Sequence, residues 1–148
     1  MRLIVLGVDA EGRSCVASQS DLPFVPVPGL PGSRIAKLFE THQSPPPPRP
    51  RGFARTNPDT IPPGHVNWFV LEHAAGADRT ADTEMHNRNA IDLVVILEGG
   101  GQLGLSDGPH QVQAGDCIVM GGIDHYSMRP GPQGCRAMSF AIGTPPPE

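Results

Sequence analysis

The fold is decided by a stretch that opens with His86-Asn-Arg88-Asn-Ala-Ile-Asp92 and closes with Gly115-Asp116-Cys-Ile-Val-Met120-Gly-Gly122-Ile-Asp-His125. Two alternating apolar runs and a glycine-rich hairpin separate these two ends. Residues i and i+2 of a strand face the same side, so folding could bring His86, Asp92 and His125 together inside a small β-barrel. Histidine and aspartate are ligands for divalent metals and also acid–base groups. We therefore expect any chemistry of this chain to lie here.

The sequence around this stretch predicts further short strands. An apolar, β-branched run at 2–8, a turn at 9–12 and a returning run at 15–19 predict an N-terminal β-hairpin within residues 1–20. Asp107-Gly108 is a strong signal for a second hairpin. Many short strands separated by turns indicate an all-β sandwich or barrel. The other segments that read as strands are 65–73, 92–97, 102–105, 110–113, 117–120 and 136–142.

Proline marks the parts of the chain that we expect to be irregular. Residues 21–34 hold four prolines and predict a loop, whereas 35–39 fits either a helical turn or a strand. The proline-rich loop 44–63 predicts polyproline II structure on the surface, with a ligand for an SH3-type domain as the alternative. Residues 144–148 predict a flexible tail, so a single domain would span 1–143.

Charge and cysteine content exclude several classes of protein. The chain has 148 residues and a formal net charge of −4, which disfavours nucleic acid and anionic membranes as partners. The basic cluster of Arg49, Arg51 and Arg55 lies in the proline-rich loop and fits a solvated linker. The three cysteines are an odd number without a CxxC motif, so we expect buried thiols in a reducing cytoplasm. The first apolar run is too short for a signal peptide, and no segment has the length of a transmembrane helix.

The order and spacing of these residues resemble the two motifs of the cupin superfamily, within residues 84–126. In the first motif, G(X)5HXH(X)3,4E(X)6G, His86 matches the first histidine, Arg88 replaces the second, Asp92 stands for the glutamate, and Gly99 follows. In the second, G(X)5PXG(X)2H(X)3N, Gly115-Asp116 opens the motif and His125 matches its histidine, with one residue fewer and no proline.

The shortened second motif is similar to that of a subgroup of small single-domain cupins, whose opening also looks like Val5 to Ser14 here. The resemblance implies a double-stranded β-helix, the jelly-roll barrel of the cupins, with an N-terminal β-hairpin and a site in the barrel mouth. It also implies a homodimer and, in many members, one Fe, Mn, Ni or Zn ion held by three histidines and a carboxylate. Met120 stands where the subgroup often has glutamine, and Ser127 where it has tryptophan.

Two chemical interpretations of the site stay open. His86, Asp92 and His125 could form a two-histidine, one-carboxylate triad for a divalent metal such as iron. Without a metal, the same three residues could carry out acid–base chemistry, because a histidine beside a carboxylate titrates near neutral pH. Arg88 cannot ligate a metal, and it must meet Asp92, Glu84 or an anionic group of a substrate if it faces inward.

The remaining candidates surround this centre. We assign Arg88, Trp68, Met120 and Ser127 to substrate binding, although Trp68 also fits packing in the core or at an edge. Strand alternation predicts that Tyr126 points away from His125. Gly101 fits a widened cavity or a bulge. His110 fits either an inward or a surface position, and no partner spacing distinguishes His42, His65 and His73.

These observations predict a cytoplasmic enzyme that acts on a small molecule with an anionic group, in a metabolic or secondary-metabolite pathway. A lyase or isomerase is favoured, with catalysis by His86, Asp92 and His125. An iron-dependent dioxygenase and a non-catalytic small-molecule-binding cupin are the alternatives.

Overall fold

The computed structural model describes residues 1–148 except 29–30, 32–33, 49–51, 57–60, 77–83 and 148. Its described part is built from strands and contains no helix, so the expectation of an all-β chain is confirmed. No described helix therefore has the length and hydropathy that a membrane crossing requires.

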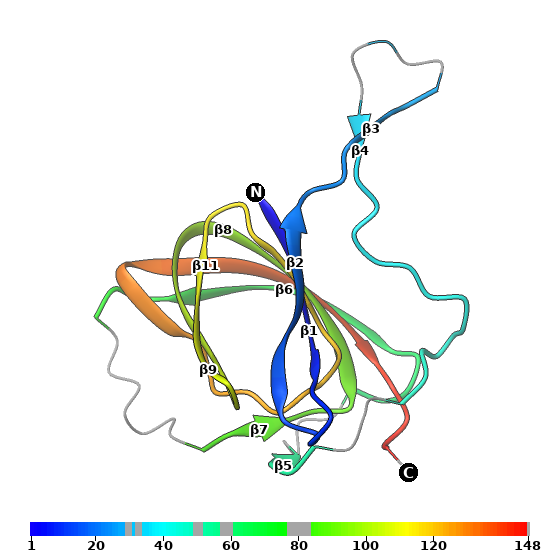
Figure 1. The fold of residues 1–148 in the computed structure, drawn as a ribbon, viewed down its shortest axis with the longest axis vertical. Helices are drawn as coiled ribbons and strands as arrows, with labels where there is room; N and C mark the ends of the chain where they lie inside the picture. The colour runs from blue at the N-terminus through cyan, green and yellow to red at the C-terminus, as the bar shows by residue number, and fades with distance from the viewer. Residues whose placement is uncertain (29–30, 32–33, 49–51, 57–60, 77–83, 148) are drawn as a thin grey trace.

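One mixed sheet makes up the body of the molecule (Figure 1). Its strands follow the order β2-β1-β10-β8-β11-β6, and β9 pairs with β8 outside this path. β1 and β10 are parallel, whereas the other neighbours are antiparallel. The strands are β1 (Arg2–Val8), β2 (Ser14–Asp21), β6 (Val66–His73), β8 (Ala90–Leu105), β9 (Gly108–Gln113), β10 (Cys117–Met120) and β11 (Arg129–Gly143).

The sheet encloses its core because its two longest strands bend. The first half of β8 pairs with β10, and its second half pairs with β9. Where β8 bends, Gly99 has a φ of 65° and Gly100 a φ of 155°. Residues with a side chain rarely adopt these values. Buried apolar side chains from both halves then pack together, among them Ile96 and Leu103 of β8, Ile4 of β1 and Val112 of β9.

Several sequence predictions can be compared with these strands. β1 and β2 form the expected N-terminal hairpin, with Gly12 at a φ of 79° in its turn, and β8 and β9 form the hairpin expected at Asp107-Gly108. The prediction of separate strands at 92–97 and 102–105 is wrong, because β8 runs through the glycines without a break. Gly101 lies within β8, and a Cβ there would overlap the Arg129 carbonyl oxygen, so it permits a close approach of two strands.

Residues 22–40 leave the body of the molecule and return to it. β3 (Val25–Pro26) and β4 (Arg34–Ile35) pair as a short two-stranded ribbon that projects from the sheet (Figure 1). Ile35 thus belongs to a strand, and residues 36–39 have no regular structure. Farther along the chain, Pro46 is fully buried. The description of 44–63 is interrupted at 49–51 and 57–60, so two of the three arginines of the basic cluster lie outside the described residues.

Near the opposite end of the body, β5 (Arg55–Thr56) pairs in parallel with β7 (His86–Asn87). The chain ends close to this region. Thr144 is 1% exposed, and its backbone N–H donates to the Asn89 carbonyl. The tail predicted at 144–148 is therefore anchored at its first residue.

Candidate functional site

A cavity of about 270 Å³ opens on the inner face of the sheet, beside the residues that the sequence singled out. β6, β8, β10 and β11 supply most of its wall, and the segment after β10 closes one side. One part of the wall is apolar, and the other part carries histidine, arginine, aspartate and hydroxyl groups. The lining residues are Phe69, Leu71, His73, His86, Arg88, Asp92, Val94, Leu103, Ile118, Met120, His125, Tyr126, Ser127, Met128 and Ser139.

Two histidines face each other in this wall. His86 and His125 form an isolated antiparallel β-bridge, in which each backbone N–H donates to the other residue's carbonyl at 2.9 Å. Their ring centroids are 4.6 Å apart, and the ring planes are tilted by 55°. The backbone bridge therefore fixes the two imidazoles as a pair, as the spacing of the sequence led us to expect.

The proton on His125 can be placed from its hydrogen bond. Nδ1 lies 2.8 Å from the Ile123 carbonyl oxygen, which can only accept, so Nδ1 carries the hydrogen. Nε2 of the neutral ring then keeps its lone pair. Burial lowers the pKa of His125, and the neighbouring His86 lowers it further, against the opposing effects of the Ile123 carbonyl and Asp92. His125 is thus a neutral base at neutral pH.

Arg88 lies in the same wall and pairs with Asp92. Its Nε donates to Asp92 Oδ2 at 3.0 Å, and its second guanidinium contact is to Asp92 Oδ1. Asp92 is completely buried, whereas the Arg88 side chain keeps 27% of its surface exposed. Of the three partners expected for Arg88, the structure therefore provides Asp92. The guanidinium still has N–H groups that this pairing does not use.

This pairing bears on the expected metal. Both oxygens of Asp92 accept from Arg88, and a guanidinium beside the carboxylate repels a cation. Among the described residues no three His, Cys, Asp or Glu side chains are grouped as a metal site would need. The donors present therefore do not fit the three-ligand site expected from His86, Asp92 and His125.

The hydroxyl of Ser139 lies in the cavity wall between two apolar residues of the neighbouring strands. Ser139 of β11 stands opposite Phe69 of β6 and Val94 of β8, and all three residues line the cavity. Ser139 is 2% exposed, and its Oγ has no hydrogen-bond partner among the described residues. Most buried hydroxyl groups have a partner, so this position suits a polar group of a bound molecule.

A buried polar network supports the histidine pair from behind. The carboxylate of Asp124, which is 4% exposed, accepts from the backbone N–H of Phe53 at 2.5 Å and of Ala54 at 3.0 Å. It also accepts from Asn87 Nδ2 at 2.6 Å. Asp124 and Asn87 each adjoin one of the paired histidines, so the network connects residues 52–56 with the His86–His125 bridge.

The structure places the remaining predicted residues as follows. Met120 and Ser127, which we assigned to substrate binding, line the cavity. Trp68 is 73% exposed and lies on the outer face of β6, so its assignment to substrate binding is corrected. The prediction that Tyr126 points away from the site is wrong, because Tyr126 lines the cavity next to His125. The segment 121–128 is not an extended strand, and alternation therefore does not apply to it.

Sequence reasoning missed His73, which also lines the cavity. The alternation of its strand could have indicated this position. His73 lies on the same face of the strand as Phe69 and Leu71, and the residues between them face the other side. His110 instead binds Asp107 on the exposed hairpin, at 2.6 Å, and His42 and His65 are exposed. The pKa of each of the three free cysteines is raised by burial, and none of them lines the cavity.

A larger hollow of about 550 Å³ lies beside the bend of β8, the end of β9 and the first part of β11, but its lining is mostly glycine and glutamine. No histidine or carboxylate is among the described residues that line it. Another hollow, of about 450 Å³, is lined by His73, Glu72 and Glu98 among others, but both of its carboxylates pair with Arg136. The cavity that holds the histidine pair is therefore the candidate site. A search with protein-family models finds no match to this chain, and neither does a search of curated proteins.

Proposed function

We propose that the chain is a cupin-type enzyme with a double-stranded β-helix, and that it catalyses a lyase or isomerase reaction on a small anionic molecule. The observation that carries this proposal is the pair of histidines beside a partly exposed arginine at one end of a largely apolar cavity. The curved all-β sheet and the spacing of the two motifs support the fold assignment. A volume of about 270 Å³ suits a small metabolite, because pockets for drug-sized ligands start near about 300 Å³.

In the proposed reaction His125 is the general base. Its Nε2 takes a proton from the carbon next to a carboxylate or carbonyl group of the substrate. The electron pair left behind forms a carbon–carbon double bond and expels a hydroxyl group from the adjacent carbon. His86 donates a proton to that group, which leaves as water, and exchange with solvent resets both rings. The lowered pKa of His125 keeps the base unprotonated at neutral pH.

Arg88 binds the substrate's anionic group in this scheme. Its pairing with Asp92 uses Nε and one terminal nitrogen of the guanidinium, and Arg88 is among the residues that line the cavity. Asp92 is then a positioning residue that acts through Arg88. Such an anchor would hold the acidic C–H bond of the substrate near the histidines.

Incubation of the protein with a panel of small β-hydroxy carboxylates in D2O, followed by proton NMR, tests this proposal. Removal of the proton by His125 predicts deuterium at the α-carbon or formation of the unsaturated acid for one panel member. We expect His125→Gln to lower the rate of this reaction by at least about 100-fold, the size of a general-base contribution, with an unchanged circular dichroism spectrum. The matched control is His65→Gln, which alters an exposed histidine outside the cavity and should leave the rate unchanged.

Two outcomes would contradict the proposal. Panel members that raise the melting temperature without any exchange or elimination would indicate the non-catalytic binding protein. A reaction that requires stoichiometric iron and stops after chelation would indicate the dioxygenase, and it would require Asp92 to leave Arg88.

A further inference from the structure

The cavity of the candidate site is long in the direction of the strands. In β11, Ala141 pairs with Asp92, whereas Cys135, six residues earlier on the same face, pairs with His73. Asp92 and His73 both line the cavity, so it follows about 20 Å of strand, at roughly 3.3 Å per residue. A volume of about 270 Å³ spread over this length leaves a narrow cross-section, which suits an extended chain better than a ring system.

The two ends of this cavity differ in polarity. At one end lie the Arg88–Asp92 pair and the two facing histidines, and Arg88 supplies a positive charge there. The rest of β6, β8 and β10 presents mainly apolar side chains to the cavity, among them Phe69, Leu71, Val94, Leu103 and Ile118. This wall suits an anionic head group at one end and an apolar chain along its length.

The far end of the cavity does not suit a second anionic group. His73 also lines the neighbouring hollow, in which Glu72 and Glu98 share the guanidinium of Arg136 at 2.6 and 2.7 Å. Two carboxylates against one guanidinium leave an excess of negative charge beside this end. The end of a bound chain that reaches His73 is therefore expected to be uncharged.

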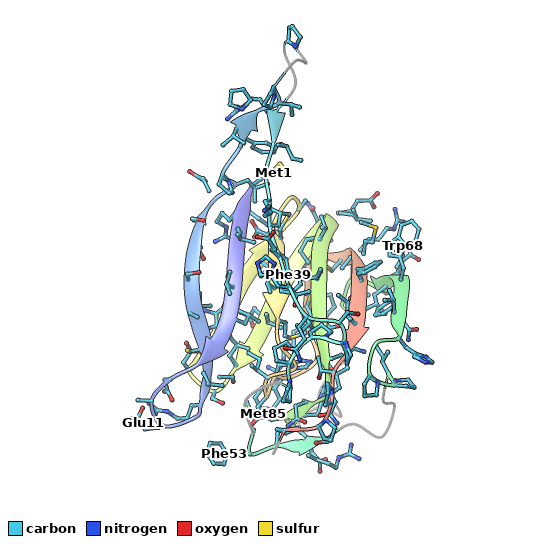
Figure 2. All side chains as sticks on the ribbon, turned by 90° about the vertical axis from the view of Figure 1, so that its right-hand side faces the viewer. Met1, Glu11, Phe39, Phe53, Trp68 and Met85 are labelled. Carbon is cyan, nitrogen blue, oxygen red and sulfur yellow. The ribbon has the colours of Figure 1, made fainter. Side chains whose placement is uncertain are left out.

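The cavity is open along β6, which is the edge strand of the sheet. Leu71 lines the cavity and is nevertheless 43% exposed. Trp68, on the outer face of the same strand, stands at the margin of the body and points away from it (Figure 2). A flexible chain can thus enter past Leu71 without separating any paired strands.

Ser139 offers a polar contact part of the way along the apolar wall. It lies two residues from Ala141, or about 7 Å of strand from the level of Asp92. Its side chain is buried, and its Oγ has no hydrogen-bond partner among the described residues. An oxygen atom on the bound chain would satisfy this hydroxyl.

We propose that the substrate is an acyl acid of medium length. Its single carboxylate binds Arg88, and its unbranched, largely apolar chain runs along β11 towards Leu71, with an oxygen function where it passes Ser139. The identification of this molecule as the substrate rests on the proposed function, whereas its binding requires no reaction.

Saturated monocarboxylates from butanoate to decanoate test the binding alone, because they have no hydroxyl group to eliminate. In isothermal titration calorimetry with the full chain, we expect the dissociation constant to fall about fourfold for each additional buried methylene group, up to the length that fills the cavity. Octan-1-ol has the chain of octanoate without its charge and should bind at least about tenfold more weakly. Equal affinity across the series, or tighter binding of succinate or 3-phenylpropanoate than of octanoate, would overturn the proposal.

Two methionines report on the direction of the bound chain. Met120 pairs with Asp92 at the charged end, and Met128 Sδ lies 3.4 Å from Cys135 Sγ at the far end. With carbon-13 in the methionine methyl groups, butanoate should shift the NMR signal of Met120, and octanoate should shift those of Met120 and Met128. Met138 does not line the cavity, and its signal should stay in place. A Met128 signal that octanoate leaves unmoved would overturn the assigned direction.

Leu71→Ser tests the apolar wall at the open edge. We expect it to weaken octanoate binding about 3- to 10-fold, through lost apolar contact, and to leave butanoate binding unchanged. Leu97→Ser is the matched control, because Leu97 is 42% exposed in β8 and does not line the cavity, and it should change neither affinity. An equal loss for both acids in Leu71→Ser would overturn the proposal.

The two proposals can fail separately. Affinity that grows with chain length, in a protein that turns over no hydroxy acid, would support the acyl-chain site and contradict the catalytic proposal. Turnover of short hydroxy acids, without any dependence of affinity on chain length, would overturn the acyl-chain site alone.

Discussion

At the scale of single residues, the Ser139 hydroxyl offers a test of substrate contact that is separate from stability. The hydroxyl is buried without a described partner and lies in the cavity wall. Its removal in Ser139→Ala should leave the free energy of unfolding unchanged or slightly higher, because no protein hydrogen bond is lost. If the substrate accepts from Ser139, KM should rise about 3- to 10-fold, the value of one neutral hydrogen bond, at constant kcat.

Steady-state kinetics and urea unfolding of the same preparations measure both quantities. Ser139→Thr keeps the hydroxyl and is the matched comparison, with a KM closer to that of the unmodified chain. An unchanged KM together with a clear loss of stability would mean that the hydroxyl has a structural role only.

Alternation was a reliable guide within regular strands and did not apply outside them. The sequence led us to expect His86 and His125 close together, and they are, although a single bridge holds His125 outside any regular strand. Alternation in β6 would have placed His73 in the cavity had it been applied. Tyr126 was misplaced because it follows a single bridged residue, where the chain does not alternate.

At the scale of elements, a buried carboxylate helps to hold the segment 52–56 against the site, together with the pairing of β5 with β7 and the contacts of Asn87 with Ala54 and Thr56. Asp124 accepts from three donors: the backbone N–H groups of Phe53 and Ala54, and the Asn87 side chain. Gly52 is needed for this approach, because a Cβ there would overlap the Asp124 carboxylate. Both backbone N–H groups donate to Oδ2, and Asn87 donates to Oδ1. An asparagine at 124 has one acceptor oxygen, so it can serve the backbone groups only by turning its NH2 group towards the Asn87 Nδ2 donor, and the remaining bonds lose the charge of the acceptor.

We therefore expect Asp124→Asn to lower the free energy of unfolding by roughly 1–3 kcal/mol, the cost of unsatisfied buried donors. Hydrogen exchange should show lost protection at the amides of Phe53 and Ala54 before the rest of the sheet. Asp107→Asn is the control, since Asp107 lies on the exposed hairpin and should change both measurements little. Full protection of the two amides in Asp124→Asn would show that other contacts hold the segment.

The two hairpins followed from the sequence more closely than the continuity of the strands did. Both hairpins were marked by turn residues, which act locally. The glycines at 99–101 were read as a break, although in the structure they allow a bend that keeps the strand paired on both sides. Glycine permits both a bend within a strand and the end of a strand. Only the pairing of the residues on either side shows which of the two occurs. The ribbon of β3 and β4 gave no signal because its proline-rich segment lacks alternation.

At the scale of the whole molecule, a buried ion pair joins the start of the chain to the turn before β10. Arg2 of β1 donates from Nε to Asp116 Oδ1 at 3.0 Å and makes a second contact to Oδ2, and Asp116 is completely buried. Burial alone would raise the pKa of Asp116. The hydrogen bonds from Arg2 and from the Gln113 backbone outweigh this effect, so the pKa lies below its ordinary value of 3.8.

The direction of this shift fixes how stability depends on pH. A carboxyl group with a lowered pKa in the folded state contributes stability above its unfolded pKa, and this contribution is lost as the pH falls through the folded value. We expect Arg2→Met to lower the free energy of unfolding at pH 7 by roughly 2–3 kcal/mol, because it leaves a buried carboxylate without its cation. Between about pH 5 and 3, the slope of stability against pH should be shallower in this variant, since the Asp116 pKa is no longer held down by Arg2. Urea unfolding at a series of pH values, with Arg13→Met as an exposed ion-pair control, measures both effects. Equal slopes for Arg2→Met and the unmodified chain would show that Arg2 does not hold down the pKa of Asp116.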